Sequence, residues 1–272
     1  MAFRAACVQL RSSDDVAENI ATASSLIRDA AGQGARFIAT PENTTLMAPD
    51  GGAKLASSYD EAHDPALPVF SALAKELGVH LLIGSLAIKV SETKTANRSF
   101  LFAPDGAVTA RYSKIHLFDV QLANGESYRE SGTVAGGDTA VVADTALGKI
   151  GLSICYDMRF PQLYRALAQK GAFAFTVPSA FTVPTGQAHW HVLLRARAIE
   201  NGAFVIAPAQ GGLHANGRKT FGHSLIVAPW GEILAEAGDE PCVITADIDP
   251  ALSAQARTRI PNLQHDRSFA GP

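Results

Sequence analysis

Short apolar runs in this chain alternate with helical patterns in some places and with tight turns in others. Phe3–Leu10 and Phe37–Thr40 are typical of strands, and a helical pattern separates them. Hairpin signals lie between apolar runs at Ala103–Gly106, Leu147–Gly148 and Pro229–Glu232. Strand–helix units favour parallel pairing whereas hairpins impose antiparallel pairing, so the mixture argues against a simple doubly wound parallel sheet. It predicts an α/β fold in which two mixed β-sheets pack face to face with helices outside them, a four-layer αββα sandwich.

The composition is typical of a cytoplasmic enzyme of one domain. Hydrophobic residues make up 47% of the 272 residues, and no linker divides residues 1–272. The net charge of −3 offers no basic footprint for nucleic acid. No apolar run approaches the roughly 18 residues of a membrane span, and residues 1–10 lack a signal-peptide core. Three cysteines are too few for a disulfide framework, and the odd count favours a reducing compartment.

One cysteine occupies a position suited to a nucleophile. Ile150–Ile154 is typical of a buried strand, and Pro161–Ala168 of a helix with proline near its first position. Cys155 lies between them, where backbone N–H groups can face a developing negative charge. Because free cysteine is among the most buried residue types, a structural thiol is the alternative. Cys7 and Cys242 lie inside apolar strands, and we expect both in the core.

Two charged residues share the position of Cys155 just beyond a strand. Glu42 follows the second predicted strand, and Lys114 follows the strand Val108–Tyr112. Reactive groups at the ends of neighbouring strands converge easily in α/β folds, so we expect the three side chains to meet. Taken singly, a glutamate or lysine after a strand is usually a solvated loop residue. The irregular segment 43–65 follows Glu42 directly and is predicted to contact substrate.

Three blocks around these residues resemble the signature blocks of the nitrilase superfamily of carbon–nitrogen hydrolases. They are Thr40–Asn43, Tyr112–Asp119 and Gly151–Pro161, in the order Glu, Lys, Cys. The resemblance covers nearly the whole chain and continues through Pro178–Phe181, Ala188–Trp190, Leu194–Asn201, Gly222–Ser224 and Pro229–Glu232. It implies an αββα sandwich that commonly pairs into a homodimer. It also implies a Glu–Lys–Cys triad, a small-molecule amide substrate, and no metal or organic cofactor.

The resemblance implies a role for each residue of the site. Cys155 is expected to attack the amide carbonyl, and Glu42 to take the thiol proton and later to activate water. Lys114 and the backbone N–H of Tyr156 are expected to stabilise the tetrahedral oxyanion. Glu130 matches a second glutamate that many members place beside the lysine, where it would favour the charged ammonium. The alternative for Glu130 is an ordinary surface-loop residue.

The resemblance also points to a branch of the superfamily. The stretches Cys155–Pro161, Ala209–Gln210 and Lys219–Ser224 look most like the branch that hydrolyses ω-amides of 2-oxo acids. Within it, Ala209–His214 is closer to deaminated-glutathione amidases than to ω-amidases of the α-ketoglutaramate type, which stay the alternative.

Substrates of this branch carry carboxylates, so cationic contacts are expected. Arg218 and Lys219 in the glycine-rich, basic segment 211–222 are candidates, and Phe181 is expected to line the pocket. Arg159 is a further candidate, although we favour a structural ion pair with Asp157 for it.

Other mechanisms remain open. A metal-dependent hydrolase would rest on His189 and His191, with His214 or His223, but residues two apart on a helix point to different faces. A serine hydrolase would use Ser153, whose surroundings lack the final glycine of the elbow motif. A catalytically silent binding protein, or transfer of the acyl group to an amine in place of water, is compatible with an intact triad.

Overall fold

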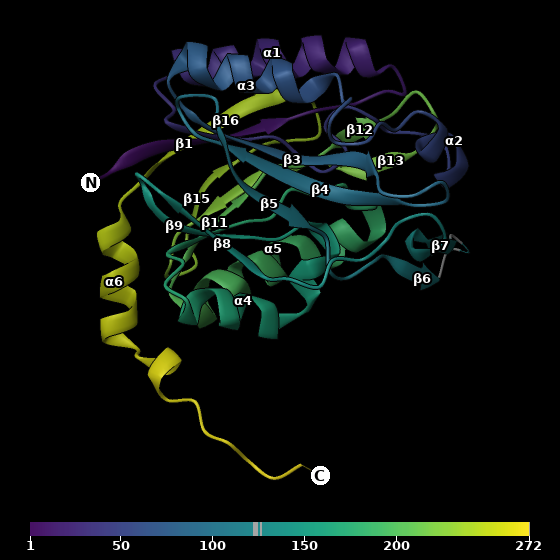
Figure 1. Cartoon of the computed structure of the whole chain (residues 1–272). Coiled ribbons are helices and arrows are strands. Elements are labelled where there is room, and N and C mark those ends of the chain that lie inside the picture. Colours follow the sequence, from purple (N-terminus) through teal and green to yellow (C-terminus); the bar gives the residue numbers. More distant parts are fainter. Residues whose placement is uncertain (122–124, 126, 272) are drawn as a thin grey trace.

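The fold is an αββα sandwich, as the sequence predicted. The computed structural model describes residues 1–121, 125 and 127–271, and within them two six-stranded mixed sheets pack face to face (Figure 1). Helices α1 (Val16–Gly32) and α3 (Ala66–Leu77) cover the first sheet, at the top of Figure 1. Helices α4 (Pro161–Gln169) and α5 (Val183–Asn201) cover the second sheet from below.

Each sheet has three parallel strands at its centre and antiparallel strands beside them. The first sheet has the order β16-β1-β2-β3-β4-β5, and the second has the order β15-β14-β11-β10-β9-β8. The strands of the first sheet are β1 (Phe3–Gln9), β2 (Phe37–Ala39), β3 (His80–Lys89), β4 (Thr95–Phe102), β5 (Val108–Ser113) and β16 (Cys242–Ile248). Those of the second are β8 (Val141–Thr145), β9 (Gly148–Leu152), β10 (Ala174–Thr176), β11 (Phe204–Ala207), β14 (Leu225–Val227) and β15 (Ile233–Glu236).

Strand alternation explains the layers. Along β1, Ala5 and Cys7 belong to the apolar core between the sheets, whereas Ala6 and Val8 belong to the core beneath α1 and α3. Successive side chains of a strand point to opposite faces, so a strand that is apolar throughout is buried on both sides. The expectation that Cys242 is a core residue is only partly right, because it begins the edge strand β16 and is half-buried.

Short elements gather at one end of the sandwich, at the right of Figure 1. They are α2 (Gly51–Ala56) and the hairpins β6 (Asp119–Gln121) with β7 (Ser127–Arg129) and β12 (Gly211–Leu213) with β13 (Lys219–Phe221). The remaining elements are α6 (Pro250–Arg259) and the 3-10 turns η1 (Glu130–Gly132), η2 (Cys155–Arg159) and η3 (Asn262–Gln264).

Two segments that the sequence indicated as loops therefore carry secondary structure. Helix α2 forms inside segment 43–65 because the Asp50 carboxylate caps it by accepting from the N–H of Ala53 at 2.9 Å. The β12–β13 hairpin forms inside segment 211–222, and Gly217 in its turn has a φ of 83°, which glycine adopts without strain.

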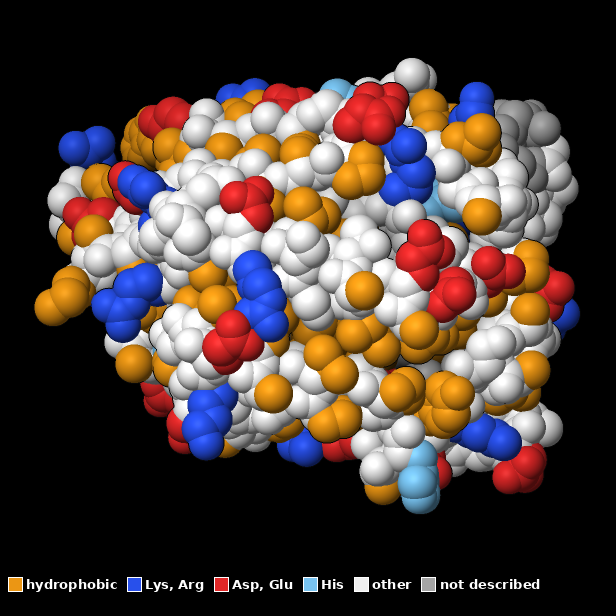
Figure 2. Space-filling view, turned by 90° about the horizontal axis from the view of Figure 1, so that it is seen from above, with side chains coloured by type: hydrophobic (Ala, Val, Ile, Leu, Met, Phe, Trp, Pro, Cys, Tyr) orange, Lys and Arg blue, Asp and Glu red, His pale blue; other side chains and the backbone are white. Residues whose placement is uncertain are grey.

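The surface over α1 and α3 carries acidic and basic side chains interspersed with apolar ones (Figure 2). None of the helices within the described residues is both long enough and apolar enough to cross a bilayer.

Candidate active site

Cys155 lies at a sharp turn between β9 and α4. Its φ is +49°, in the left-handed region that residues with a side chain adopt only at a cost of about 1–3 kcal/mol. The Cys155 N–H donates to the carbonyl of Pro178 at 2.9 Å, which fixes the backbone of the turn. Pro161 begins α4 at its first position, as the sequence predicted. The thiol is thus presented by a strained strand-to-helix turn.

The buried carboxylate of Asp157 fixes this turn through hydrogen bonds. Asp157 accepts hydrogen bonds from the N–H of Ile154 at 2.9 Å and from the hydroxyl of Tyr112 at 2.7 Å. It also accepts from the N–H of His116 at 3.0 Å and contacts the ring Nδ1 of His116 at 2.7 Å. The predicted ion pair between Asp157 and Arg159 is wrong, because these partners surround the carboxylate. The Arg159 guanidinium instead lies over aromatic rings.

Glu42 is held by groups from both sheets. Its Oε1 accepts from Nδ2 of Asn97 at 2.8 Å, and its Oε2 accepts from the N–H of Ala180 at 2.9 Å. The backbone before Glu42 packs so tightly on β3 that a Cβ at Gly84 would lie 1.9 Å from the carbonyl oxygen of Thr40. A side chain at Gly84 would therefore displace the segment that carries Glu42.

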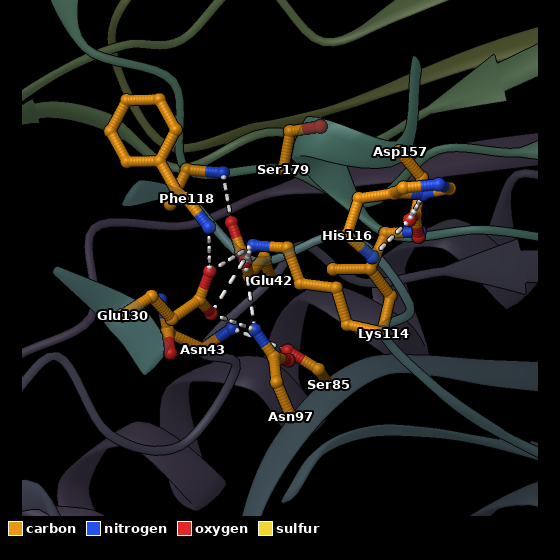
Figure 3. A network of polar contacts seen from close by, with 12 residues as sticks. Glu42, Asn43, Ser85, Asn97, Lys114, His116, Phe118, Glu130, Asp157 and Ser179 are labelled. Atoms are coloured by element: carbon orange, nitrogen blue, oxygen red, sulfur yellow. Dashed lines mark hydrogen bonds and ion pairs between the residues drawn. The ribbon is translucent and has the colours of Figure 1, made fainter. Parts of the chain in front are cut away.

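Lys114 lies between two glutamates. Its Nζ is 2.9 Å from Oε1 of Glu42 and 2.9 Å from Oε2 of Glu130, and its side chain is only 2% exposed (Figure 3). Glu130 Oε2 also accepts from the N–H of Phe118 at 2.7 Å, and Glu130 Oε1 accepts from Nδ2 of Asn97 at 3.2 Å. The ammonium therefore has one fixed position.

These contacts set the charges of the site. Burial alone would raise the pKa of Glu42, but the charge and hydrogen bond of Lys114, with a hydrogen bond from Cys155, lower it to about 2. Burial opposes the charge of Lys114, yet Glu130 and Glu42 raise its pKa well above the usual value. Burial and the Glu42 carboxylate raise the pKa of the Cys155 thiol, against the pull of Lys114. The resting site therefore holds a carboxylate, an ammonium and a neutral thiol.

The three residues meet by a different route from the one that the sequence suggested. We expected the ends of neighbouring strands to converge. Instead, β3 and β4 separate β2, which precedes Glu42, from β5, which precedes Lys114, and β9 before Cys155 belongs to the other sheet. The site therefore lies where the two sheets face each other at one end of the sandwich.

A cavity of about 230 Å³ opens over these residues. Tyr156, Phe181 and Arg218 line it, together with part of segment 43–65, so the structure places these predicted contacts at the site. Lys219 is exposed and does not line the cavity. Arg159 does not line it either, although its guanidinium lies 5.7 Å and 5.5 Å from the ring centroids of Tyr156 and Phe181.

The sequence did not indicate two polar residues of the site, Asn97 and Lys54. Asn97 lies inside β4 and bonds both glutamates, and the only signal was a polar residue in the middle of a buried strand. Lys54 in α2 lines the cavity, and its Nζ donates to Oδ1 of Asn43 at 2.8 Å. Burial lowers the pKa of Lys54, Glu130 and Glu42 oppose this shift, and the charge of Arg218 adds to it.

The rival residues lie elsewhere. Ser153 Oγ is buried and bonds the hydroxyl of Tyr164 at 2.7 Å and the carbonyl of Thr176 at 2.8 Å. His189 contacts Arg159, whereas His191 contacts a carboxylate on β15. His223 contacts the same carboxylate, Glu236, whereas His214 bonds Ser12 and Thr220.

Comparison with known proteins agrees with this geometry. A family model described as carbon-nitrogen hydrolase matches residues 4–258. The chain belongs to the carbon–nitrogen hydrolase family. It is thus an amidase of the nitrilase superfamily with an active-site cysteine.

Individual relatives match over nearly the whole chain. A protein of Synechocystis named deaminated glutathione amidase is 42% identical over 268 residues, 97% of each chain. Human omega-amidase NIT2 is 36% identical over 266 residues, which are 98% of this chain and 95% of the relative. The crystal structure of the C. elegans NitFhit protein superimposes with a TM-score of 0.91 at 32% identity, covering 98% of this chain and 65% of that one.

Proposed function

We propose that this amidase hydrolyses a linear ω-amide of a 2-oxo acid, with deaminated glutathione as the preferred substrate. The observation that carries the proposal is a pair of cations on the cavity wall. Lys54 and Arg218 both line the cavity, and no carboxylate oxygen of the described residues lies within 4.0 Å of either cation. Among the described residues, the Arg218 guanidinium donates to neutral groups, the carbonyl of Ala180 at 3.0 Å and the sulfur of Met47. Two such cations suit a substrate with two carboxylates.

Deaminated glutathione has this charge pattern. It joins a 2-oxoglutaryl group to cysteinylglycine, so it carries one carboxylate beside the 2-oxo group and another on the terminal glycine. α-Ketoglutaramate carries only the first. The relative at 42% identity is named for deaminated glutathione and the relative at 36% identity is named an omega-amidase, which supports this order of preference.

The first chemical step forms a tetrahedral intermediate. Cys155 attacks the amide carbonyl while its proton passes to the Glu42 carboxylate. Because the resting thiol is neutral, proton transfer and attack are coupled, and the negative charge that leaves Glu42 reappears on the tetrahedral oxyanion. Lys114 and the N–H of Tyr156 stabilise that oxyanion, a contribution on the order of 10²–10³ in rate for one such donor.

Departure of the amine then forms the thioester, and hydrolysis of the thioester returns the enzyme to its resting state. Glu42 gives its proton to the leaving amine, the carbon–nitrogen bond breaks, and the 2-oxoglutaryl thioester remains on Cys155. Glu42 then takes a proton from water, which attacks the thioester, and it passes this proton to the Cys155 sulfur as 2-oxoglutarate is released. Glu130 acts as a positioning residue, because its two bonds to Lys114 at 2.9 and 3.2 Å hold the ammonium in place.

The two candidate substrates give a direct test. Both leave the same 2-oxoglutaryl group on Cys155 and differ only in the leaving amine, so one assay of released 2-oxoglutarate follows both reactions. We expect a higher kcat/KM for deaminated glutathione than for α-ketoglutaramate, and no turnover by Cys155→Ala. The reverse preference would make the protein an ω-amidase with the same mechanism, and turnover of neither would leave only the family-level activity.

We also propose that two copies pair through α5. This helix and the adjoining turn before β15 expose large apolar side chains, among them Val192, Ile199 and Trp230, and Arg195 joins them by donating to the carbonyl of Gly231 at 2.8 Å. Sedimentation of the chain as a dimer, and of Val192→Asp as a monomer, would support the pairing. A monomeric wild type would contradict it.

A reducing compartment such as the cytoplasm suits this site. Cys7, Cys155 and Cys242 are all unpaired thiols. The proposed nucleophile must remain a thiol for each turnover, and an oxidising compartment would favour its modification.

A further inference from the structure

Three potential metal ligands from distant parts of the chain meet on the surface of the second sheet. They are His191 on α5, His223 between β13 and β14, and Glu236 at the end of β15. Nε2 of His191 lies 2.8 Å from Oε1 of Glu236, and Nδ1 of His223 lies 2.9 Å from the same oxygen. The three ligand atoms all lie within 4.8 Å of one another. None of the three residues lines the cavity at Cys155.

We propose that His191, His223 and Glu236 bind one divalent transition-metal ion of the zinc type, outside the reaction centre. Two imidazoles and one carboxylate form a ligand set of zinc sites that keep a position open. The imidazole nitrogens disfavour magnesium and calcium, which take oxygen ligands. The proposal does not depend on the substrate or the catalytic mechanism.

Two of the three distances between the ligand atoms require little rearrangement. At metal–ligand lengths of about 2.0–2.2 Å, tetrahedral ligand atoms stand about 3.3 Å apart. The two nitrogen–oxygen contacts of 2.8 and 2.9 Å would each open by less than about 0.6 Å. In the metal-free form, the ring nitrogen that faces the carboxylate carries a hydrogen and donates it, because a carboxylate only accepts. On binding, that hydrogen moves to the other ring nitrogen, and the nitrogen that faces the ion presents its lone pair.

The surroundings hold His223 in place before any ion binds. Its φ of +55° is unusual for a residue with a side chain. The backbone is fixed on both sides, because the N–H of His223 donates to the carbonyl of Gly238 at 2.8 Å and its carbonyl accepts from Nε1 of Trp190 at 2.8 Å. The ring of Phe221 stacks on the His223 ring at a centroid distance of 4.3 Å. A Cβ at Gly186 would lie 2.2 Å from the Phe221 ring, so only glycine leaves room for this stack.

The site is open to solvent and joins three elements. The side chains are 32%, 32% and 34% exposed, so an ion can enter and water can complete its coordination. A bound ion would tie α5 to the edge strand β15 and to the end of the β12–β13 hairpin, which carries Arg218. It would thus brace one wall of the cavity without touching the reacting atoms.

Zinc uptake by the purified chain tests the proposal. After chelator treatment and removal of the chelator, ZnCl₂ is added in competition with a chromophoric zinc indicator. We expect one ion per wild-type chain and the same uptake by Cys155→Ala, which lacks the cavity thiol. His191→Ala and His223→Ala should weaken binding by more than about 10-fold, because the loss of a ligand exceeds the loss of an outer partner. Zinc should raise the Tm of the wild type but not of His191→Ala.

Matched controls separate this site from ordinary surface histidines. His189→Ala removes an imidazole two residues away on α5, and His63→Ala removes one from a histidine–carboxylate pair that lacks a second histidine. Both should bind zinc like the wild type. If His223→Ala does not fold, Glu236→Gln serves in its place. It keeps the shape of the cluster and should also weaken zinc binding. The absence of stoichiometric uptake, full-strength uptake by His191→Ala and Glu236→Gln, or loss of uptake in Cys155→Ala would each overturn the proposal.

Discussion

Two groups of charged residues line the cavity, and they differ in their partners. In the first group, the Lys114 ammonium contacts two carboxylates, and the side chains of Lys114 and Glu42 are 2% and 5% exposed. In the second group, the cations Lys54 and Arg218 have no carboxylate of the described residues within 4.0 Å. The paired residues already have ion-pair partners before substrate binds, whereas the unpaired cations would gain a partner only from a bound anion.

This contrast separates the chemistry from the choice of substrate. Substitutions of the paired residues should lower the rate for every amide, because they alter the groups that are proposed to react. Substitutions of the unpaired cations should lower activity only toward substrates that carry carboxylates.

Loss of the thiol should have the largest effect. Cys155→Ala removes the proposed nucleophile, so we expect kcat to fall on the order of 10⁶-fold for all amides, as for the loss of a nucleophile in other covalent hydrolases. The release of 2-oxoglutarate measures it, with Cys242→Ala as the control thiol, which should keep full activity. Substantial turnover by Cys155→Ala would contradict the mechanism.

Replacement of the ammonium should affect both rate and stability. Lys114→Met removes the proposed oxyanion contact, and we expect kcat to fall by about 10²–10³-fold for charged and neutral amides alike. The buried Glu42 and Glu130 also lose their common partner, which should cost about 3–5 kcal/mol in the free energy of unfolding. Activity assays and denaturant unfolding measure the two effects. The exposed Lys149→Met is the control, and equal behaviour of the two variants would refute the role of Lys114.

Removal of the unpaired cations should select among substrates. Lys54→Met and Arg218→Ala should each lower kcat/KM for deaminated glutathione by about 10–100-fold, mainly through KM, because a hydrogen bond to a charged group contributes about 1.5–3 kcal/mol. A small neutral amide should lose little. Lys219→Ala, one residue from Arg218 but outside the cavity, is the matched control. An equal loss for neutral and charged amides would show that these cations act on the chemistry.

The free energy of unfolding at acidic pH should depend on the paired charges. The pKa of Glu42 is lowered to about 2, so its carboxylate stabilises the folded state fully above the usual pKa of 4.5. That contribution, on the order of 3 kcal/mol, is lost as the pH falls from about 4.5 to about 2. Denaturant unfolding across this range should show a shallower loss for Glu42→Gln than for the wild type. The exposed Glu232→Gln should follow the wild type, and parallel curves for wild type and Glu42→Gln would contradict the assignment.

The sequence predicted those features that local patterns determine. The strand end, the turn at Cys155 and the helix that begins at Pro161 are all encoded within a dozen residues. The hairpin signals and the strand–helix units together gave the mixed sheets. The positions of Glu42 and Lys114 just beyond strands were visible in the same way, and the family resemblance joined them to Cys155.

Features that depend on distant contacts were missed. Asp157 was expected to pair with Arg159 two residues away, but Tyr112 and His116, 45 and 41 residues away in sequence, bind it. Asn97 and Lys54 reach the site from β4 and α2. The one local signal was a polar Asn97 in the middle of a buried strand, and Lys54 had none. The contact of His191 with Glu236 spans 45 residues in sequence. It was missed because the sequence analysis considered His191 together with the nearby His189.

In the proposed mechanism, Cys155 carries the acyl group of the substrate. Rapid acid quenching of the enzyme during turnover, followed by mass spectrometry of its peptides, tests it most directly. We predict that deaminated glutathione and α-ketoglutaramate leave the same 2-oxoglutaryl adduct on Cys155. Turnover without an adduct on Cys155 at any quench time, or an adduct on another residue such as Ser153, would contradict the account.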